Sequence, residues 1–246
     1  TLQRIQEFAD GEYGFEILSV KDANGKALPY VINDTMMRID LPQPLVPEAA
    51  TSFSIDWQVN IINEPIIGGR GGYEHFPEND TYIYFLAQWF PRMAAYTDYA
   101  GWQHKQFLGR GEFTLEFGDY KVAITAPADH VVAATGVLQN PVEVLSETQR
   151  ERLTEAENVD RPMFIITPEE AKKNETSRSK ETKTWVFEAE NVRDFAWASS
   201  RKFIWDAQLM QQESDKPVWA MSYYPNEGEP LWSKYSTQAI VHTVEV

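Results

Sequence analysis

The feature that most constrains this chain is a strict alternation of apolar and polar residues over 51–61. Every second side chain is hydrophobic, from Phe53 through Trp57 to Ile61, while the residues between them are Ser, Asp, Gln and Asn. Successive side chains of a β-strand point to opposite faces, so this pattern predicts a strand with one buried face. It argues against a helix here, because helical faces repeat every 3.6 residues.

The same alternation recurs elsewhere and predicts a mainly β protein. Turn-forming residues at 22–25 and 117–120 resemble hairpin connections. Many strands with few helices between them favour antiparallel sheets packed as a sandwich or saddle. The further expected strands carry Met37, Ile39 and Leu41; Phe113, Leu115 and Phe117; Tyr120, Val122 and Ile124; Trp185, Phe187 and Ala189; and Trp219, Met221 and Tyr223.

Helices are expected to be few and short. Ser-Glu-Thr-Gln at 146–149 is a capping box that predicts a polar helix to about Glu157. Thr-Pro-Glu-Glu at 167–170 combines an N-cap, a first-turn proline and a glutamate at the third position, so a helical turn is predicted to begin there. The polar segment 171–183 is predicted to be an exposed hairpin tip, and 191–199 a short helix capped by its first residue.

The end of the chain has a helical pattern that begins at Pro230. No Gly, Asn or Pro stops this helix before Val246, and the chain opens without a Met, so we expect a piece of a longer protein. We place the boundary near residue 228, with 1–228 forming a β domain and 229–246 opening the next domain. The apolar residues at helical spacing are Leu231, Trp232, Tyr235, Ala239, Ile240 and Val244.

Charge and composition exclude several classes of partner. Lys plus Arg total 22 and Asp plus Glu total 37, which gives a net charge of −15. Such a surface repels phosphate backbones and anionic membrane faces, so no nucleic-acid partner is expected. No apolar stretch approaches the ~20 residues that a membrane-spanning helix needs. The chain has no cysteine, which excludes disulfides and thiol chemistry but assigns no compartment.

A search for catalytic motifs finds none within the chain. None of the four histidines begins an H-E-x-x-H or H-x-x-E-H zinc motif. The glycine-rich run at 68–72 lacks the Lys-Ser/Thr of a phosphate-binding loop, so a flexible loop between strands is the better interpretation. No G-x-S-x-G nucleophile elbow occurs. We therefore expect neither a catalytic residue nor a metal site within these residues.

Aromatic residues make up 13% of the chain, and most are expected to pack in the core. The alternative is a platform for stacking sugars. One cluster, residues 82–93, is apolar except for Gln88 and Arg92. Burying either side chain is unfavourable unless it is hydrogen-bonded, so these two residues serve either the local structure or a ligand.

This cluster begins a resemblance to a known family. Residues 87–102, AQWFPRMAAYTDYAGW, resemble a segment of bacterial zinc aminopeptidases of the aminopeptidase N family, which are gluzincin metallopeptidases. Residues 109–113 and 116–122 resemble the next strands of these proteins, and VRDFAWA at 192–198 resembles another of their segments. The resemblance spans about residues 28–246, and the segments keep the family's order and spacing.

The resemblance implies a saddle-shaped N-terminal β domain, followed by a thermolysin-like catalytic domain. The catalytic domain would carry H-E-x-x-H and bind zinc, and this motif is absent here. In the family, the N-terminal domain packs over the active-site cleft, and one of its Gln or Glu residues helps to hold the free amino group of the peptide substrate.

Gln88 is the candidate for this substrate-binding position, with a structural hydrogen-bonding role as the alternative. Arg92 and Asp98 are expected to form an ion pair that fixes the local strands and turn. Trp89 and Trp102 are expected to pack in the interior. None of these is predicted to be catalytic.

The sequence therefore favours the non-catalytic N-terminal β domain of a zinc metallopeptidase, with its own catalytic domain as partner and a peptide as the substrate of the whole protein. Leu231, Trp232, Tyr235 and Ile240 should then form an exposed apolar patch. Relatives occur in the cytoplasm and periplasm, so the bacterial compartment stays open.

One alternative is a free-standing β-sandwich module that binds carbohydrate or protein, which predicts an exposed row of Trp or Tyr. The other is a scaffold relative with a degenerate catalytic domain.

Overall fold

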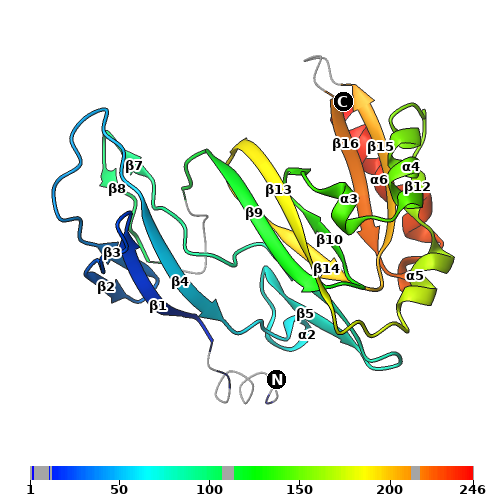
Figure 1. The fold of residues 1–246 in the computed structure, drawn as a ribbon, viewed down its shortest axis with the longest axis horizontal. Helices are drawn as coiled ribbons and strands as arrows, with labels where there is room; N and C mark the ends of the chain where they lie inside the picture. The colour runs from blue at the N-terminus through cyan, green and yellow to red at the C-terminus, as the bar shows by residue number, and fades with distance from the viewer. Residues whose placement is uncertain (1, 3–10, 12, 107–113, 212–216, 246) are drawn as a thin grey trace. The chain divides into compact units, whose positions relative to one another are not determined.

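The computed structural model of the protein describes residues 2, 11, 13–106, 114–211 and 217–245 (Figure 1). The chain divides into two compact units that are interleaved along the sequence. The first unit comprises 1–68 and 89–117, and the second comprises 69–88 and 118–246. Small antiparallel sheets and a few helices make up both units, which confirms the mainly β prediction.

In its described residues, the first unit has three two-stranded sheets and the short helix α2 (Glu64–Ile67). The predicted alternation in β4 is confirmed: the side chains of Phe53, Ile55 and Trp57 are partly buried, and the residues between them are exposed. Trp57 contacts Phe15 edge-on at 5.4 Å between ring centroids. The sheets pair β1 (Phe15–Asp22) with β4 (Phe53–Val59), β2 (Tyr30–Asn33) with β3 (Met36–Ile39), and β7 (Tyr96–Thr97) with β8 (Gly101–Trp102).

The predicted turn at 22–25 is confirmed. The Asp22 side chain accepts hydrogen bonds from the backbone N–H groups of Asn24 and Lys26, both at 2.9 Å. Gly25 has φ of +78°, a backbone conformation that glycine adopts without steric cost. The turn chemistry is therefore local, and the sequence alone could predict it.

The second unit contains three sheets and most of the helices (Figure 1). Their strand orders are β10-β14-β6-β5, β11-β13-β9 and β12-β15-β16. No helix among the described residues is long and apolar enough to cross a membrane. The strands are β5 (Gly71–Phe76), β6 (Thr81–Leu86), β9 (Gly118–Pro127), β10 (Val131–Ala134), β11 (Val137–Leu138), β12 (Met163–Ile166), β13 (Thr182–Val192), β14 (Trp197–Ser200), β15 (Ile204–Gln211) and β16 (Pro217–Tyr224); the helices are α3 (Pro141–Val144), α4 (Glu147–Ala156), α5 (Pro168–Asn174), the 3-10 turn η1 (Asn226–Gly228) and α6 (Leu231–Glu245).

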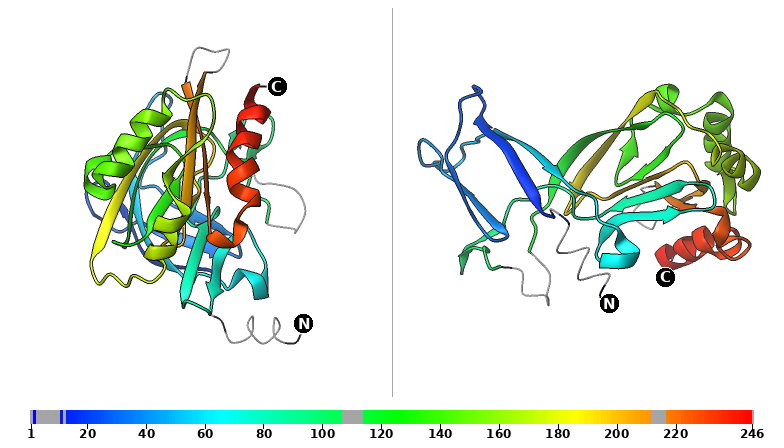
Figure 2. Two further views of the ribbon diagram at one scale, coloured as in Figure 1. Left: turned by 90° about the vertical axis from the view of Figure 1, so that its right-hand side faces the viewer. Right: turned by 90° about the horizontal axis from the view of Figure 1, so that it is seen from below.

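The sheet β12-β15-β16 is covered on both faces. Helix α4 lies against one face and α6 against the other, as Figure 2 shows in its left panel. Strand β15 is accordingly buried at six of its eight positions. A strand covered on both sides shows nearly continuous burial instead of alternation.

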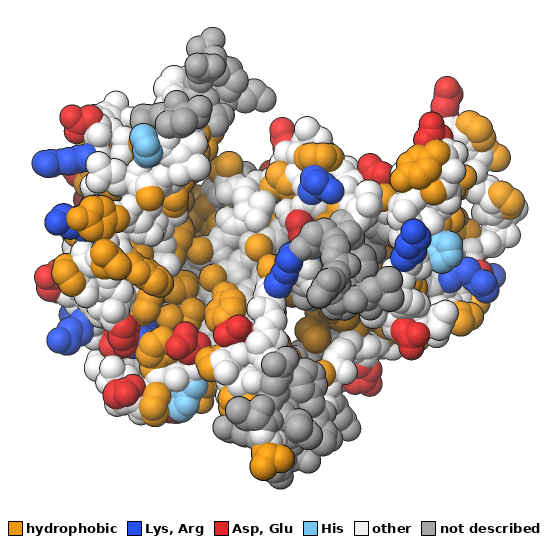
Figure 3. Space-filling model, turned by 180° about the vertical axis from the view of Figure 1, so that it is seen from behind, with side chains coloured by type: hydrophobic (Ala, Val, Ile, Leu, Met, Phe, Trp, Pro, Cys, Tyr) orange, Lys and Arg blue, Asp and Glu red, His pale blue; other side chains and the backbone are white. Residues whose placement is uncertain are grey.

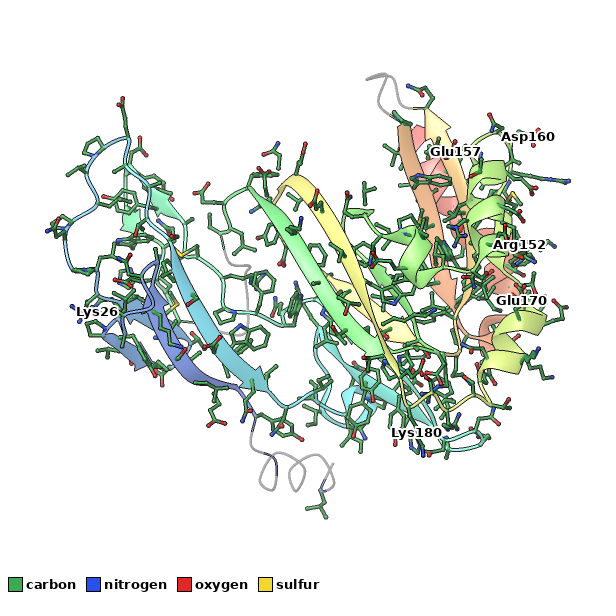
Figure 4. The ribbon with its side chains drawn as sticks, viewed as in Figure 1. Lys26, Arg152, Glu157, Asp160, Glu170 and Lys180 are labelled. Carbon is green, nitrogen blue, oxygen red and sulfur yellow. The ribbon has the colours of Figure 1, made fainter. Side chains whose placement is uncertain are left out.

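Both predicted capping boxes are confirmed. The Ser146 hydroxyl accepts from the Gln149 N–H at 3.2 Å, and the Gln149 side chain accepts from the Ser146 N–H at 2.9 Å. Thr167 and Glu170 make the same reciprocal pair at the start of α5. Arg152 of α4 also donates to Glu170 at 2.6 Å and ties the two helices together, while Glu157 lies exposed past the end of α4 (Figure 4).

Two predictions for the middle of the chain are wrong. Strand β9 begins at Gly118, so 117–120 is not a hairpin turn, and Leu115 lies outside any strand. Phe117 is 60% exposed, and Phe113 lies outside the described residues. Local alternation over three apolar residues did not suffice, because a strand also needs a partner for its backbone groups.

Two further predictions are wrong for the same kind of reason. The expected helix over 191–199 is absent, because β14 begins at Trp197 and pairs with both β10 and β6. The segment 171–183 is no exposed hairpin tip, since α5 continues to Asn174 and β13 begins at Thr182. The Asn174 side chain donates to the backbone carbonyls of Asp129 and Arg201. Long-range pairing and polar anchoring override the local polarity of these segments.

Candidate functional site

Gln88 lies in a bend two residues after the end of β6. Strand β6 is held on both sides, by β5 and by β14, so the position of the bend is well defined. The side chain is exposed, contrary to the burial suggested by its apolar neighbours. Among the residues that the structure describes, its amide makes no hydrogen bond and is accessible to a ligand.

The other residues of the resembling segment belong to the first unit. No ion pair between Arg92 and Asp98 is found among the described residues, and the role of the two side chains stays a prediction. Trp89 is partly buried and contacts Trp57 at 5.9 Å, which confirms a packing role. Trp102 is instead 52% exposed and contacts the ring of Tyr96 edge-on at 5.2 Å.

The hairpin β7–β8 presents a group of exposed aromatic rings. Tyr96 is 63% exposed, Tyr99 is 84% exposed, and both lie within seven residues of the chain from Trp102. Single exposed rings are common, but rings that gather into one exposed patch often mark an interaction site. Their exposure could not be predicted from the sequence, because aromatic residues are more often buried.

His130 has a structural role in the core of the second unit. In the described part of the chain, no three His, Asp or Glu side chains are grouped so as to hold a metal ion. His130 is buried, with Nδ1 2.8 Å from the Ser199 hydroxyl. Burial, reinforced by the positive charge of Arg201, lowers the pKa of His130 to about 4, so the imidazole is neutral at pH 7.

The glycine run at 68–72 ends in β5, where a Cβ on Gly71 would lie 3.1 Å from the Phe85 carbonyl oxygen.

Helix α6 is confirmed, and its polarity is the most informative feature of the second unit. The side facing its own sheet carries Thr237, 2% exposed, and Val241, 8% exposed. The predicted patch is confirmed, since all four of its residues are exposed, Ile240 least at 37%. Leu231, Trp232 and Tyr235, exposed at 60%, 46% and 52%, lie on the side of the helix away from Thr237, and we call these three the outer face of α6.

A buried polar network anchors α6 to the sheet. The Thr237 hydroxyl contacts the Asp206 carboxylate of β15 and lies 2.7 Å from the hydroxyl of Ser222. The Tyr224 hydroxyl donates to the other oxygen of Asp206 at 2.5 Å. Burial raises the pKa of Asp206 despite the opposing effect of the hydrogen bonds from Thr237 and Tyr224. The network holds α6 in one orientation and so determines which face points outward.

The sequence offered no signal for this network. Asp206 and Thr237 are 31 positions apart, and neither stands out from its neighbours. Their pairing depends on β15, β16 and α6 coming together.

No protein-family model matches the chain, and no curated protein matches it. Among solved structures, it is similar to a mutant of an M1 zinc metallopeptidase from Deinococcus radiodurans, crystallised with a Tyr-Ser-Ala substrate. The identity is 12%, the TM-score is 0.48, and the match covers 92% of this chain and 42% of that one. The chain thus spans less than half the length of that peptidase, and a match at this level assigns no activity.

Proposed function

We propose that this chain is the N-terminal, non-catalytic β domain of a zinc-dependent metallopeptidase of the aminopeptidase type. Residues 1–228 form the β domain, a wall of the substrate cleft, and 229–246 open the catalytic domain. The observation that carries this proposal is the ordered resemblance of residues 87–102, 109–122 and 192–198 to that family. The mainly antiparallel fold agrees with the β-rich domain that the resemblance implies.

The outer face of α6 supports the proposal. Burying a large apolar side chain fully is favourable by about 1.5–3 kcal/mol, and this face leaves Leu231, Trp232 and Tyr235 exposed. Its buried side combines the polar anchor Thr237 with Val241, which packs against Met210 and Ala220. A thermolysin-like catalytic domain packed on α6 would cover this face.

In the proposed protein, zinc belongs to the catalytic domain, where it polarises the peptide carbonyl and activates water. This chain contributes positioning. The exposed amide of Gln88 offers a carbonyl oxygen that can accept a hydrogen bond from the substrate's terminal ammonium. Strand β6 is paired on both sides, by β5 and by β14, so the bend that follows it would hold that oxygen in place.

The first test is to produce the gene product that extends beyond Val246 and to assay it on aminoacyl-anilides, with and without a zinc chelator. We expect an H-E-x-x-H motif and chelator-sensitive hydrolysis in the longer protein, and none in the 246-residue chain. Hydrolysis by the 246-residue chain alone would contradict a non-catalytic role. A related continuation without zinc ligands would instead identify a scaffold relative, and an unrelated continuation would refute the assignment.

Gln88 is tested in the same longer protein. Losing a hydrogen bond to a charged group costs about 1.5–3 kcal/mol, so Gln88→Ala should lower kcat/KM about tenfold or more. Stability should not change, because the side chain is exposed. Gln139→Ala, at another exposed position, is the matched control. Equal kinetics for both variants would remove Gln88 from the substrate site.

A binding module is the second candidate function, favoured by the exposed rings of Tyr96, Tyr99 and Trp102. Aromatic rings of this kind can stack on sugars, so the hairpin β7–β8 would be the binding surface. A glycan-array screen with the 246-residue chain tests this, with Trp102→Ala as the matched variant. Binding that Trp102→Ala abolishes would support the module, and an array without signal would exclude it.

A further inference from the structure

A groove of about 330 Å³ lies at the N-terminal end of α6, entirely within the second unit. Figure 3 shows the face that carries it, where hydrophobic side chains gather on the left and several Asp and Glu side chains lie just below them. The residues that line the groove are Glu74, Phe76, Pro225, Glu227, Gly228, Glu229, Leu231 and Trp232.

The charge of this groove is negative and only partly balanced. It is lined by three glutamates and by no Lys or Arg. The buried Lys202 lies 2.7 Å from Glu227 and 3.5 Å from Glu175, so its charge is already shared between two carboxylates. Neither Glu74 nor Glu229 takes part in an ion pair among the described residues. The groove therefore has room for a further cation.

Glu229 adds a second, independent observation. Its Oε2 accepts a hydrogen bond from Ser233 at 2.5 Å, but Oε1 is buried and has no hydrogen-bond partner in the described part of the chain. A buried carboxylate oxygen without a donor is unfavourable. A donor carried by a partner would relieve this.

The walls of the groove also suit a cation. The Phe76 ring already holds the ammonium of Lys202 at 4.4 Å from its centroid. Trp232 contacts Tyr224 edge-on at 5.9 Å and packs over Gly228, where a Cβ would lie 2.8 Å from the indole. Aromatic faces beside carboxylates are favourable surroundings for a guanidinium group, which can stack and hydrogen-bond at the same time.

We propose that this groove accepts an arginine side chain from the surface that covers the outer face of α6, which the proposed function assigns to the catalytic domain. Leu231 and Trp232 belong to both the groove and the outer face, so one surface can cover the two together. The guanidinium would pair with Glu74 and with the partly exposed Glu229, and a rotation of the Glu229 side chain would bring the unpartnered Oε1 to it. Only the identity of the partner rests on the proposed function; the chemistry of the groove does not.

The test uses the 246-residue chain labelled with 5-fluorotryptophan, with N-acetyl-arginine amide as the probe. The Trp232 fluorine resonance is assigned with Trp232→Phe and followed during titration. We expect the arginine probe to shift this resonance, and N-acetyl-citrulline amide, of similar shape but neutral, to bind at least about tenfold more weakly. Equal binding of the two probes, or no shift with arginine, would overturn the proposal.

Variants connect the binding to the carboxylates. Glu74→Gln and Glu229→Gln should each weaken arginine binding about fivefold, and Glu157→Gln on the far side of the sheet should leave it unchanged. Glu74 is exposed on β5, so its variant keeps the test valid even if Glu229→Gln disturbs α6. If arginine binds as expected but the gene's continuation encodes no catalytic domain, the assigned partner is wrong and the groove chemistry stands. If Glu157→Gln weakens binding as much as Glu74→Gln, the groove assignment is wrong.

Discussion

Thr237 offers the sharpest test of how α6 is held against its sheet. It is 2% exposed, and its hydroxyl contacts both Asp206 and Ser222. Thr237→Val keeps the shape of the side chain but removes the hydroxyl. A hydrogen bond to a charged or partly charged group contributes about 1.5–3 kcal/mol, so we expect this variant to lose about 2 kcal/mol of unfolding free energy.

Thr237→Ser separates the hydrogen bond from packing. Serine keeps the hydroxyl and loses one methyl group, at a cost of about 1 kcal/mol. If the polar network holds the helix, the valine variant is therefore less stable than the serine variant. If apolar packing held the helix, the order would be reversed.

The assay is urea-induced unfolding followed by tryptophan fluorescence, together with hydrogen exchange over 231–245. Thr243→Val is the control, because the exposed Thr243 hydroxyl donates to the Ala239 carbonyl of its own helix and, among the described residues, to no other element. It should change stability by less than about 0.5 kcal/mol. The reasoning is refuted if Thr237→Val matches the wild type, or if Thr237→Ser is the less stable of the two.

The same pair predicts a pH dependence. Burial raises the pKa of Asp206, so the stability linked to this group is present below its ordinary pKa and is lost as the pH rises through the raised value. The Thr237 hydroxyl opposes that loss by stabilising the carboxylate. The cost of Thr237→Val should therefore be larger at pH 8 than at pH 4, and a cost independent of pH would show that Asp206 is not ionised in the fold.

Three other predictions concern the second unit. Lys202→Met should cost about 3–5 kcal/mol because it leaves the buried Glu175 unpaired, whereas Lys121→Met, in an exposed pair, should cost less than about 1 kcal/mol in the same urea assay. Because burial lowers the pKa of His130 to about 4, stability should fall as the pH drops from about 6.5 toward 4, and His130→Gln should flatten that part of the urea-midpoint curve; an unchanged curve would contradict it. Ser146→Ala should cost about 1 kcal/mol and lower hydrogen-exchange protection in α4, and unaltered protection there would show that the cap is dispensable.

Strands and caps with a strong local pattern could be predicted from the sequence. The alternation in β4, the turn at 22–25 and the capping box at Ser146 each depend on residues close together in the chain. Helix α6 was predicted in the same way, from helical spacing, whereas the exposure of its apolar residues was predicted from the expectation that a further domain covers them. In these cases side-chain periodicity and nearby hydrogen bonds determine the structure, so the sequence is sufficient.

The predictions that failed depended on distant partners. Residues 197–200 form a strand because β10 and β6 supply hydrogen bonds on both sides, and 171–183 is anchored by Asn174 to backbone carbonyls elsewhere in the unit. No local pattern encodes such pairings, since backbone groups accept any strand that packing brings beside them.

For the candidate site, too, some features could be predicted from the sequence and others depend on distant contacts. Residue types alone identified Gln88 and gave the composition of α6. Tertiary structure alone decided that the Gln88 amide is exposed, that Thr237 turns toward Asp206, and that Glu74 and Glu229 line one groove. Which face of an element is buried is a property of its neighbours, because burial and charge balance are sums over side chains far apart in the sequence.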